Sequence, residues 1–201
     1  MATRRPFRQT WTAIRALLVL TVVLGLAYPL AITAVGQVAL PAQANGSLIR
    51  VGDKVVGSSL IGQSFADADG NALPQWFQSR PSAAGAGYDG GASSGSNDGP
   101  EDADLVTAIG ERQAAIVDSD GVVVGDIPAD AVTASASGLD PHITPAYALL
   151  QVARVAEARG LDEATVRDLV ERHILGRDLG YLGEPTVNVL QLNLALAALS
   201  D

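Results

Sequence analysis

The pattern of hydrophobic and polar positions divides the chain into a long apolar stretch near the N-terminus and a mixed remainder. No charged residue occurs between Arg15 and Arg50, and residues 14–36 are mostly apolar. A helix needs about 20 such residues to cross a bilayer core of about 30 Å. We therefore predict an N-terminal tail over residues 1–13, a transmembrane helix over 14–36 and a separate domain over 37–201.

Charge at the two ends of this stretch predicts its orientation. Four basic residues precede it, namely Arg4, Arg5, Arg8 and Arg15. The first acidic residue, Asp53, comes after it. Because basic flanks stay on the cytoplasmic side, we expect a single-pass protein of the cell membrane with its N-terminus in the cytoplasm and its C-terminal domain outside.

A cleaved secretory signal is the alternative interpretation of this stretch. Residues 42–44 (Ala-Gln-Ala) have the small-residue pattern of a cleavage site, and cleavage there would release a secreted acidic binding protein. The apolar run is nearly twice the length of about 7 to 15 residues typical of a signal, which favours a retained anchor. Small residues and an intramembrane proline predict a face that packs against other helices: Gly25, Tyr28, Pro29 and Gly36.

Beyond this stretch the patterns predict one exported α+β domain with a helical C-terminal half. Two short strands are expected on either side of the turn at Gly52 and Asp53, and a long loop rich in glycine and serine over residues 79–100. Helical spacing and capping residues predict helices over 104–117, over 145–159 and after Asp162, with caps at Asp104, Thr144 and Asp162.

The last segment is ambiguous, because its leucines alternate as they would in a strand. Asn188 and Gln191 have the spacing of a capping box, which starts a helix. We therefore predict a helix over residues 189–199.

Charge and composition restrict the classes of function. Of the 13 basic residues four precede the apolar stretch, so the exported part keeps nine against 22 acidic residues, a charge near −13. Phosphates would repel such a surface, so nucleic acid is not expected as a partner, and solubility is the simplest role of the charge. The chain has no cysteine, which excludes disulfides and thiol catalysis.

One short pattern resembles a catalytic motif. Residues 91–95 match G-x-S-x-G, which would make Ser93 the nucleophile of a membrane-tethered serine hydrolase. That motif works between a strand and a helix, and the preceding residues here do not form a strand. Its acid and base would have to be Asp140 with His142 or with His173.

Metal and nucleotide motifs are incomplete. Residues 67–71 resemble the start of a calcium loop, but Ala72 and Gln78 stand where glycine and glutamate are needed, so we predict a polar turn. His173 falls on the apolar face of its helix, which favours a core histidine over a metal ligand. The sequence has no P-loop for ATP, and no metal site is predicted.

Segments along nearly the whole chain resemble the C-subunit family of the Kdp potassium-transporting ATPase. They are residues 27–30, 35–37, 43–49, 57–65, 80–83, 93–97, 132–140, 143–145 and 187–196. The resemblance implies a non-catalytic accessory subunit of an ATP-driven complex for high-affinity potassium uptake. Its partners in that hetero-oligomer would be a potassium-channel-like subunit and a P-type ATPase subunit.

The resemblance also implies roles for particular residues. The subunit would stabilise the assembly and act as a catalytic chaperone that raises the ATP affinity of the pump subunit. Gln63 would be the ATP-binding residue, with no cofactor bound tightly and ATP associating through the pump subunit. Because Gln63 is expected outside and ATP is cytoplasmic, any effect on ATP use should pass through the span. The loop residues that would contact partners are Arg80, Ser93, Ser94, Ser96 and Asn97.

Overall fold

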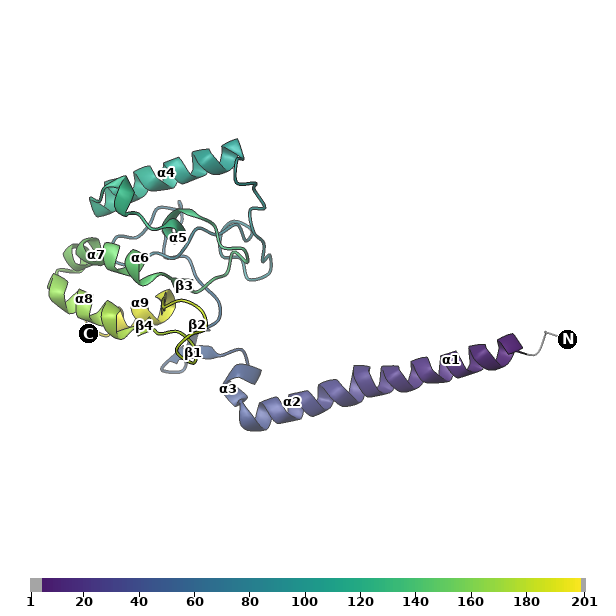
Figure 1. Cartoon of the computed structure of the whole chain (residues 1–201). Coiled ribbons are helices and arrows are strands. Elements are labelled where there is room, and N and C mark those ends of the chain that lie inside the picture. Colours follow the sequence, from purple (N-terminus) through teal and green to yellow (C-terminus); the bar gives the residue numbers. More distant parts are fainter. Residues whose placement is uncertain (1–4, 200–201) are drawn as a thin grey trace. The chain divides into compact units, whose positions relative to one another are not determined.

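The apolar stretch forms a single helical rod. The computed structural model describes residues 5–199 and divides into two units, one up to Leu48 and one from Ile49 (Figure 1). The first unit contains α1 (Arg5–Val22), a π-helical turn η1 (Val23–Ala27) and α2 (Tyr28–Ala39). Within it, the 33 residues Phe7–Ala39 are long and apolar enough to cross a membrane. The predicted helix over 14–36 lies inside this rod, and Arg4 lies outside the described residues.

The π-helical turn has its cause in Pro29. Proline has no N–H and clashes with the carbonyl four residues before it, here that of Gly25. Over Val23–Ala27 the backbone hydrogen bonds span five residues instead of four, so that the N–H of Tyr28 donates to the carbonyl of Val23. The helix therefore passes the proline without a break.

The chain folds back at the end of the rod. The short helix α3 (Pro41–Ala44) follows Leu40, and a Cβ at Gly36 would lie 3.6 Å from the Cβ of Ala44. The amide of Asn45 donates to the side-chain oxygen of Gln37 at 3.0 Å. The predicted strands follow at once as β1 (Leu48–Val51) and β2 (Lys54–Ser58), which pair as a two-stranded sheet.

The second unit is built around a small antiparallel sheet and a group of helices. The sheet order is β3 (His142–Ile143), β5 (Thr186–Asn188) and β4 (Ile174–Leu175). Val187 in the central strand lies opposite both Ile143 and Ile174. Strands of two or three residues are too short to produce a periodic signal, which is why the sequence patterns did not predict this sheet.

The helices of this unit pack mainly around α8. They are α4 (Ala103–Asp120), η2 (Val124–Asp126), α5 (Ala129–Val132), α6 (Pro145–Leu150), α7 (Val152–Arg159), α8 (Glu163–Arg172) and α9 (Val189–Ala197). Helix α8 contacts α6, α7 and α9, and α4 lies on the far side of α7 from α8 (Figure 1). The core lies among these elements and includes Phe77, Val155, Val166, Val187 and Leu192, all fully buried. The α+β fold class is therefore confirmed.

The capping predictions hold for three helices and fail for one. The side chains of Thr144, Asp162 and Asn188 accept hydrogen bonds from the first turns of α6, α8 and α9. The prediction that Asp104 caps α4 is wrong. The helix begins one residue earlier, and the carboxylate of Asp102 accepts the N–H of Asp104.

The predicted continuous helix over 145–159 is also wrong, because the chain has a turn at Gln151 between α6 and α7. Gln151 is fully buried, and its side-chain amide is used to bind another segment of the chain, as described below. The helical spacing of apolar residues cannot indicate a contact with a residue so far away in the sequence.

Candidate functional site

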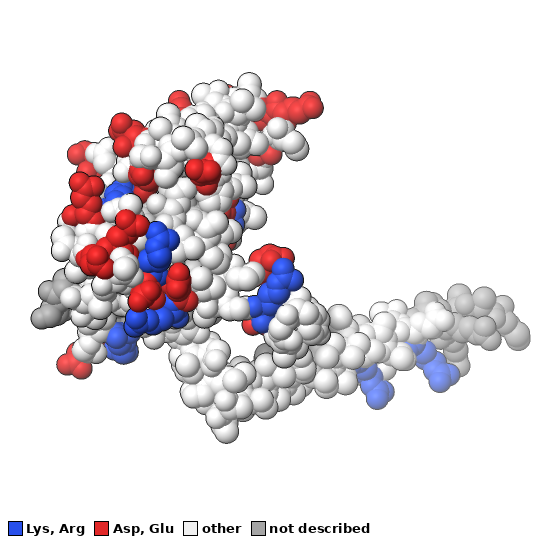
Figure 2. Space-filling model, turned by 60° about the vertical axis from the view of Figure 1, so that its left-hand side comes forward, with Lys and Arg blue, Asp and Glu red and all other residues white. Residues whose placement is uncertain are grey.

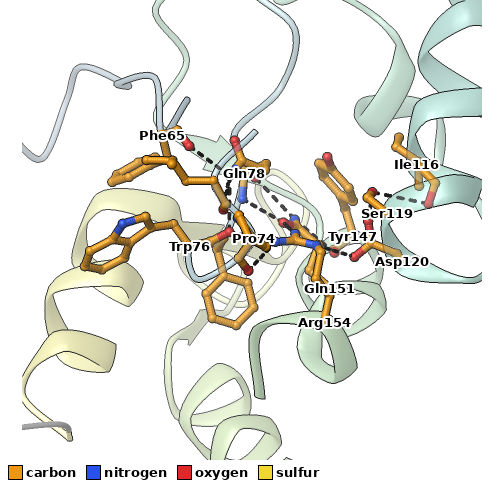
Figure 3. Close-up of polar contacts among 12 residues, drawn as sticks. Phe65, Pro74, Trp76, Gln78, Ile116, Ser119, Asp120, Tyr147, Gln151 and Arg154 are labelled. Atoms are coloured by element: carbon orange, nitrogen blue, oxygen red, sulfur yellow. Dashed lines mark hydrogen bonds and ion pairs between the residues drawn. The ribbon is translucent and has the colours of Figure 1, made fainter. Parts of the chain in front are cut away.

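An irregular segment at residues 74–78 buries the side chain of Phe77 in the core of the second unit, and distant side chains form hydrogen bonds with its backbone. The amide oxygen of Gln151 accepts the N–H of Gln78 at 2.6 Å, and its nitrogen donates to the Gln78 carbonyl at 3.2 Å. Gln151 therefore acts toward Gln78 as a neighbouring strand would. Figure 3 shows these residues meeting between the loop and the helices.

Arg154 of α7 holds the same segment through its whole guanidinium group. One nitrogen donates to the carbonyls of Pro74 and Trp76 at 2.7 and 3.1 Å, and Nε donates to Asp120 of α4 at 2.8 Å (Figure 3). Its second terminal nitrogen donates to Gln151. The side chains of Arg154 and Asp120 are only 8% and 4% exposed, so removing either one would leave a buried charge without its partner. This pair ties α4 to the segment.

A cleft of about 910 Å³ lies beside this ion pair. Residues of α4, including Arg112 and Ile116, line it together with Ser79 and Tyr147. Burial is the main cause that raises the pKa of the Tyr147 phenol, so this group stays neutral. The cleft walls carry both signs of charge, and Arg154 is already paired with Asp120.

After residue 78 the chain continues into the predicted contact loop, which begins with Arg80. The Arg80 guanidinium lies 3.1 Å from the carboxylate of Asp140, and the Tyr88 hydroxyl donates to the Arg80 carbonyl at 2.6 Å. Burial alone would raise the pKa of Asp140, but hydrogen bonds from His142 and Arg80 outweigh it and hold this pKa below its usual value. Burial raises the pKa of Tyr88 to about 12. Arg80 thus anchors the loop.

The serine-rich part of the loop is held against residues 136–138. The Ser93 hydroxyl and the Ser94 N–H both bond the carbonyl of Ser137, at 2.9 and 3.0 Å. Gly138 has φ +67°, and a Cβ there would lie 2.7 Å from the Ser94 carbonyl oxygen, so this close approach requires glycine. The exposed side chains are those of Ser93, Ser94, Ser96 and Asn97. The structure therefore brings these four predicted residues together on one anchored, solvent-facing loop.

The geometry at Ser93 does not form a nucleophile. Ser93 lies in a loop with neither a strand before it nor a helix directly after it. Its hydroxyl donates to a backbone carbonyl, while Nδ1 of His142 lies 3.7 Å from Asp140 and Nδ1 of His173 bonds the carbonyl of Leu169. In the described part of the chain no histidine activates Ser93. His173 is partly buried at the end of α8 and bonds the backbone of its own helix, and its role as a core histidine stays a prediction.

Gln63 is built into the second unit next to β2. Its side-chain nitrogen donates to the carbonyl of Val56 at 2.9 Å, and its own carbonyl accepts the Ser79 hydroxyl. A Cβ at Gly57 would lie 2.3 Å from that nitrogen, so the amide packs directly on the strand. The ATP contact of Gln63 stays a prediction.

The predicted polar turn at residues 67–71 is confirmed. The Asp67 carboxylate accepts the backbone N–H groups of Asp69 and Asn71 and the side-chain amide of Asn71. The side-chain bond from Asn71 is the largest cause that lowers the pKa of Asp67. Its oxygens are therefore used within the turn.

The predicted packing residues of the span lie in two different settings. Gly25, Tyr28 and Pro29 occur at the π-helical turn, where a Cβ on Gly25 would meet no atom closer than Thr21 at 3.9 Å. The Tyr28 side chain is 60% exposed. Gly36 instead faces Ala44 of α3. The face at Gly25 is therefore free for another helix, whereas the chain itself uses the space at Gly36.

These features define a membrane-associated α+β protein with one candidate spanning helix, in whose described residues we find no catalytic group assembled. The model of the KdpC family, described as "K+-transporting ATPase, c chain", matches residues 10–198. The potassium-transporting ATPase KdpC subunit of Kineococcus radiotolerans is 56% identical over 189 residues, which cover 94% of this chain and 93% of the relative. The corresponding subunit of Gemmatimonas aurantiaca is 58% identical over 182 residues, or 90% and 88% of the two chains.

The chain therefore belongs to the KdpC family, and it is a non-catalytic accessory subunit of the potassium-transporting ATPase complex. Sequence reasoning recognised the loop and the span of this subunit. It missed the residues that hold the segment 74–78, which precedes the loop, namely Gln151, Arg154 and Asp120. Their polar character was visible in the sequence, but the partners that make them essential lie far away along the chain.

Proposed function

We propose that this chain stabilises the assembly of the potassium uptake complex and acts as a catalytic chaperone that raises the ATP affinity of the pump subunit. Its direct partners in this proposal are a potassium-channel-like subunit and a P-type ATPase subunit. The observation that carries the proposal is the match to the KdpC family over residues 10–198, which includes the span and the exported domain together.

The rod supplies the first attachment in this proposal. Its side chains from Phe7 to Ala39 are not buried against the rest of the described chain, so lipid or other helices must cover them. Because Gly25 has no side chain, the surface of the rod is open beside the π-helical turn. Small residues allow the backbones of two membrane helices to approach closely. We expect a helix of a partner subunit at this place.

The serine-rich loop supplies the second attachment. Its backbone is fixed by Ser137 and by the Arg80–Asp140 pair, so its exposed hydroxyl and amide groups are already ordered before a partner arrives. A preordered loop loses less conformational entropy on binding than a free one. This favours the loop as a contact with an exported part of the complex.

The effect on ATP use is indirect in this proposal. The four arginines at the N-terminus favour a cytoplasmic N-terminus and an exported domain. The domain then lies on the other side of the membrane from ATP, and the amide of Gln63 is bonded to β2. A change in ATP affinity would pass through the contact between the span and the pump subunit.

Co-expression with the other subunits of the complex tests the proposal. We expect a tagged copy of this chain to purify from membranes with a P-type ATPase subunit. The purified complex should have a lower KM for ATP than the complex prepared without this chain. Absence of the ATPase subunit from the purified material would contradict the assembly role. An equal KM with and without the chain would contradict only the chaperone role.

A further inference from the structure

The cleft beside the Arg154–Asp120 pair contains a buried donor that the described chain does not use. Tyr147 lines this cleft of about 910 Å³ and is 5% exposed. Among residues 5–199 nothing accepts a hydrogen bond from its hydroxyl, and Figure 3 shows no dashed line there. Burial raises the pKa of this phenol, so it keeps its proton. Buried polar groups need partners, so an acceptor must enter the cleft, either a water molecule or an atom of a ligand.

One end of the cleft is basic. Arg112 of α4 lines it and donates to the carbonyl of Val132 at 2.7 Å. Arginine has five N–H donors, and Arg112 forms no ion pair with an acidic residue of the described chain. Pro81 lies at the same end, because its carbonyl accepts the N–H of Ser135, three residues after Val132. The charge of Arg112 is therefore available to an anionic group in the cleft.

The other end of the cleft is acidic. Arg154 and Glu157 lie about one turn apart on the face of α7 that lines the cleft. Arg154 is paired with Asp120, the last residue of α4. The side chain of Glu157 has no such partner within the part of the chain that the structure describes. Arg112 precedes Asp120 by eight residues, so the two ends are about 12 Å apart along α4.

A ligand that fits both ends carries two opposite charges. A carboxylate suits Arg112 and the Tyr147 hydroxyl, and an ammonium group suits Glu157. The domain is strongly acidic, and Figure 2 shows acidic side chains spread widely over the face in view. A simple anion would be repelled as it approaches, whereas a molecule with both charges and no net charge would not. The volume of the cleft lies in the range of about 300 to 1,000 Å³ that is typical of small-molecule sites.

We propose that this cleft binds a small, elongated zwitterion. The carboxylate of the ligand accepts hydrogen bonds from Arg112 and from the Tyr147 hydroxyl. Its ammonium group contacts Glu157, and its apolar middle lies along α4 at Ile116, which also lines the cleft. All of these residues belong to the second unit, and the proposal is independent of the assembly and chaperone roles.

Binding of a simple zwitterion to the full chain in detergent tests the proposal. The probe is ε-aminocaproate, which holds a carboxylate and an ammonium group at opposite ends of a methylene chain. Caproate, which lacks the ammonium, and pentylamine, which lacks the carboxylate, are the matched control compounds. Ligand-detected NMR titration measures the Kd of each. We expect saturable binding of ε-aminocaproate with a Kd at least about tenfold lower than that of either control, because each control lacks one charged contact.

Two results of this titration would overturn the proposal. One is the absence of saturable binding of ε-aminocaproate at millimolar concentration. The other is equal binding of ε-aminocaproate and caproate, which would mean that the acidic end of the cleft takes no part.

Substitutions in the cleft locate the binding. Tyr147→Phe should raise the Kd of ε-aminocaproate about three- to tenfold, because it removes one hydrogen bond. The lost hydroxyl has no partner in the described chain, so the urea midpoint should not fall, which separates a binding role from a structural one. Arg112→Gln should raise the Kd of both ε-aminocaproate and caproate. Glu157→Gln should raise that of ε-aminocaproate and leave that of caproate unchanged.

The control variants are Tyr181→Phe and Arg172→Gln, which change the same residue types outside the cleft. The Tyr181 residue and the Arg172 side chain are 68% and 74% exposed. Both variants should bind ε-aminocaproate as the wild type does. If the cleft variants bind it equally well, the probe binds elsewhere and the proposal is overturned.

Discussion

Asn193 and Phe77, separated by 116 positions in the sequence, are joined by a reciprocal pair of hydrogen bonds. The side-chain oxygen of Asn193 accepts the N–H of Phe77, and its nitrogen donates to the Phe77 carbonyl, both at 2.9 Å. Both residues are buried. Gln151 binds the next residue, Gln78, in the same way from another helix. Two side-chain amides therefore replace the neighbouring strand that this segment lacks.

We predict that Asn193→Ala lowers the free energy of unfolding by about 2 to 4 kcal/mol, because it leaves a buried N–H and a buried carbonyl without partners. Urea unfolding of the full chain in detergent measures this change. Trp76, next to Phe77, is the fluorescent reporter, in a Trp11→Phe background that removes the second of the two tryptophans. Gln191→Ala, an exposed position on the same helix, should change little. A loss no larger than that of this control would contradict the account.

Asn193 also illustrates how far the sequence alone predicts this fold. Local signals were sufficient where the partner is local: Thr144, Asp162 and Asn188 each cap a helix within three residues. The turn at Gln151 was not predicted, and the bonds of its side chain to Gln78, 73 positions away, were not predicted either. The helix pattern through residue 151 is intact, so nothing nearby indicates the turn.

The same distinction holds for the candidate site. The contact loop was recognised from its composition and its resemblance to the family. Its anchoring by Asp140 and Ser137 depends on pairings over 40 or more residues. The sheet around Val187 was missed because its strands are too short to alternate visibly. Long-range pairing and very short strands thus account for most of what sequence patterns did not predict.

The carboxylate of Asp140 predicts a pH dependence of stability, because burial, which would raise its pKa, is outweighed by hydrogen bonds from His142 and by the contact with Arg80. The pKa of Asp140 is lower in the folded chain than its usual 3.8, so the unfolded chain binds the proton more tightly. The stabilisation is therefore complete above about pH 4 and is lost as the pH falls through the lowered value. Asp140→Asn should flatten this part of the dependence of the urea midpoint on pH. Asp118→Asn, an exposed control, should keep the wild-type slope. An unchanged slope in Asp140→Asn would mean that the contacts of this carboxylate with His142 and Arg80 do not stabilise the folded chain.

The orientation of the rod is a separate prediction. Arg8 and Arg15 lie on the described helix, and with Arg4 and Arg5 they should hold the N-terminus in the cytoplasm. A reporter active only in the cytoplasm should be silent when it is fused after Asp201, and the same reporter fused before Met1 should be active. A cytoplasmic signal from the C-terminal fusion would contradict the predicted orientation. The C-terminal domain would then lie in the cytoplasm, where Gln63 could contact ATP directly.

Substitutions at the two glycines of the span, Gly25 and Gly36, should have different effects. Gly25→Leu adds bulk to an open face, so we expect less co-purified pump subunit with normal membrane insertion. Interactions between membrane helices average about 0.6 kcal/mol each, so the loss should be partial. Gly25→Ala is the conservative control. Gly36→Leu must displace Ala44, so it should disturb α3 even in the chain alone, as judged by protease sensitivity near residue 45. Full co-purification of Gly25→Leu would place the attachment elsewhere.

A final prediction concerns the acidic residues at the end of the long loop. They are Asp98, Glu101, Asp102 and Asp104, all exposed at the start of α4 or just before it. If the exported domain lies near the outer entrance of a potassium path, this cluster raises the local cation concentration. Neutralising all four to Asn or Gln should raise the KM for potassium of the complex. Asn at position 102 can still cap α4, so the helix is preserved.

Ionic strength separates this steering effect from a role in solubility. Surface charges act over about 8 Å at physiological salt and farther in dilute buffer, so the rise in KM should be larger at low ionic strength. The maximal ATPase rate should stay near that of the wild type, because this subunit is not catalytic. The matched control neutralises four exposed acids elsewhere: Asp118, Asp126, Glu157 and Glu171. If both quadruple variants change the KM equally, net charge is responsible; if neither does at any salt concentration, the acidic surface serves solubility alone.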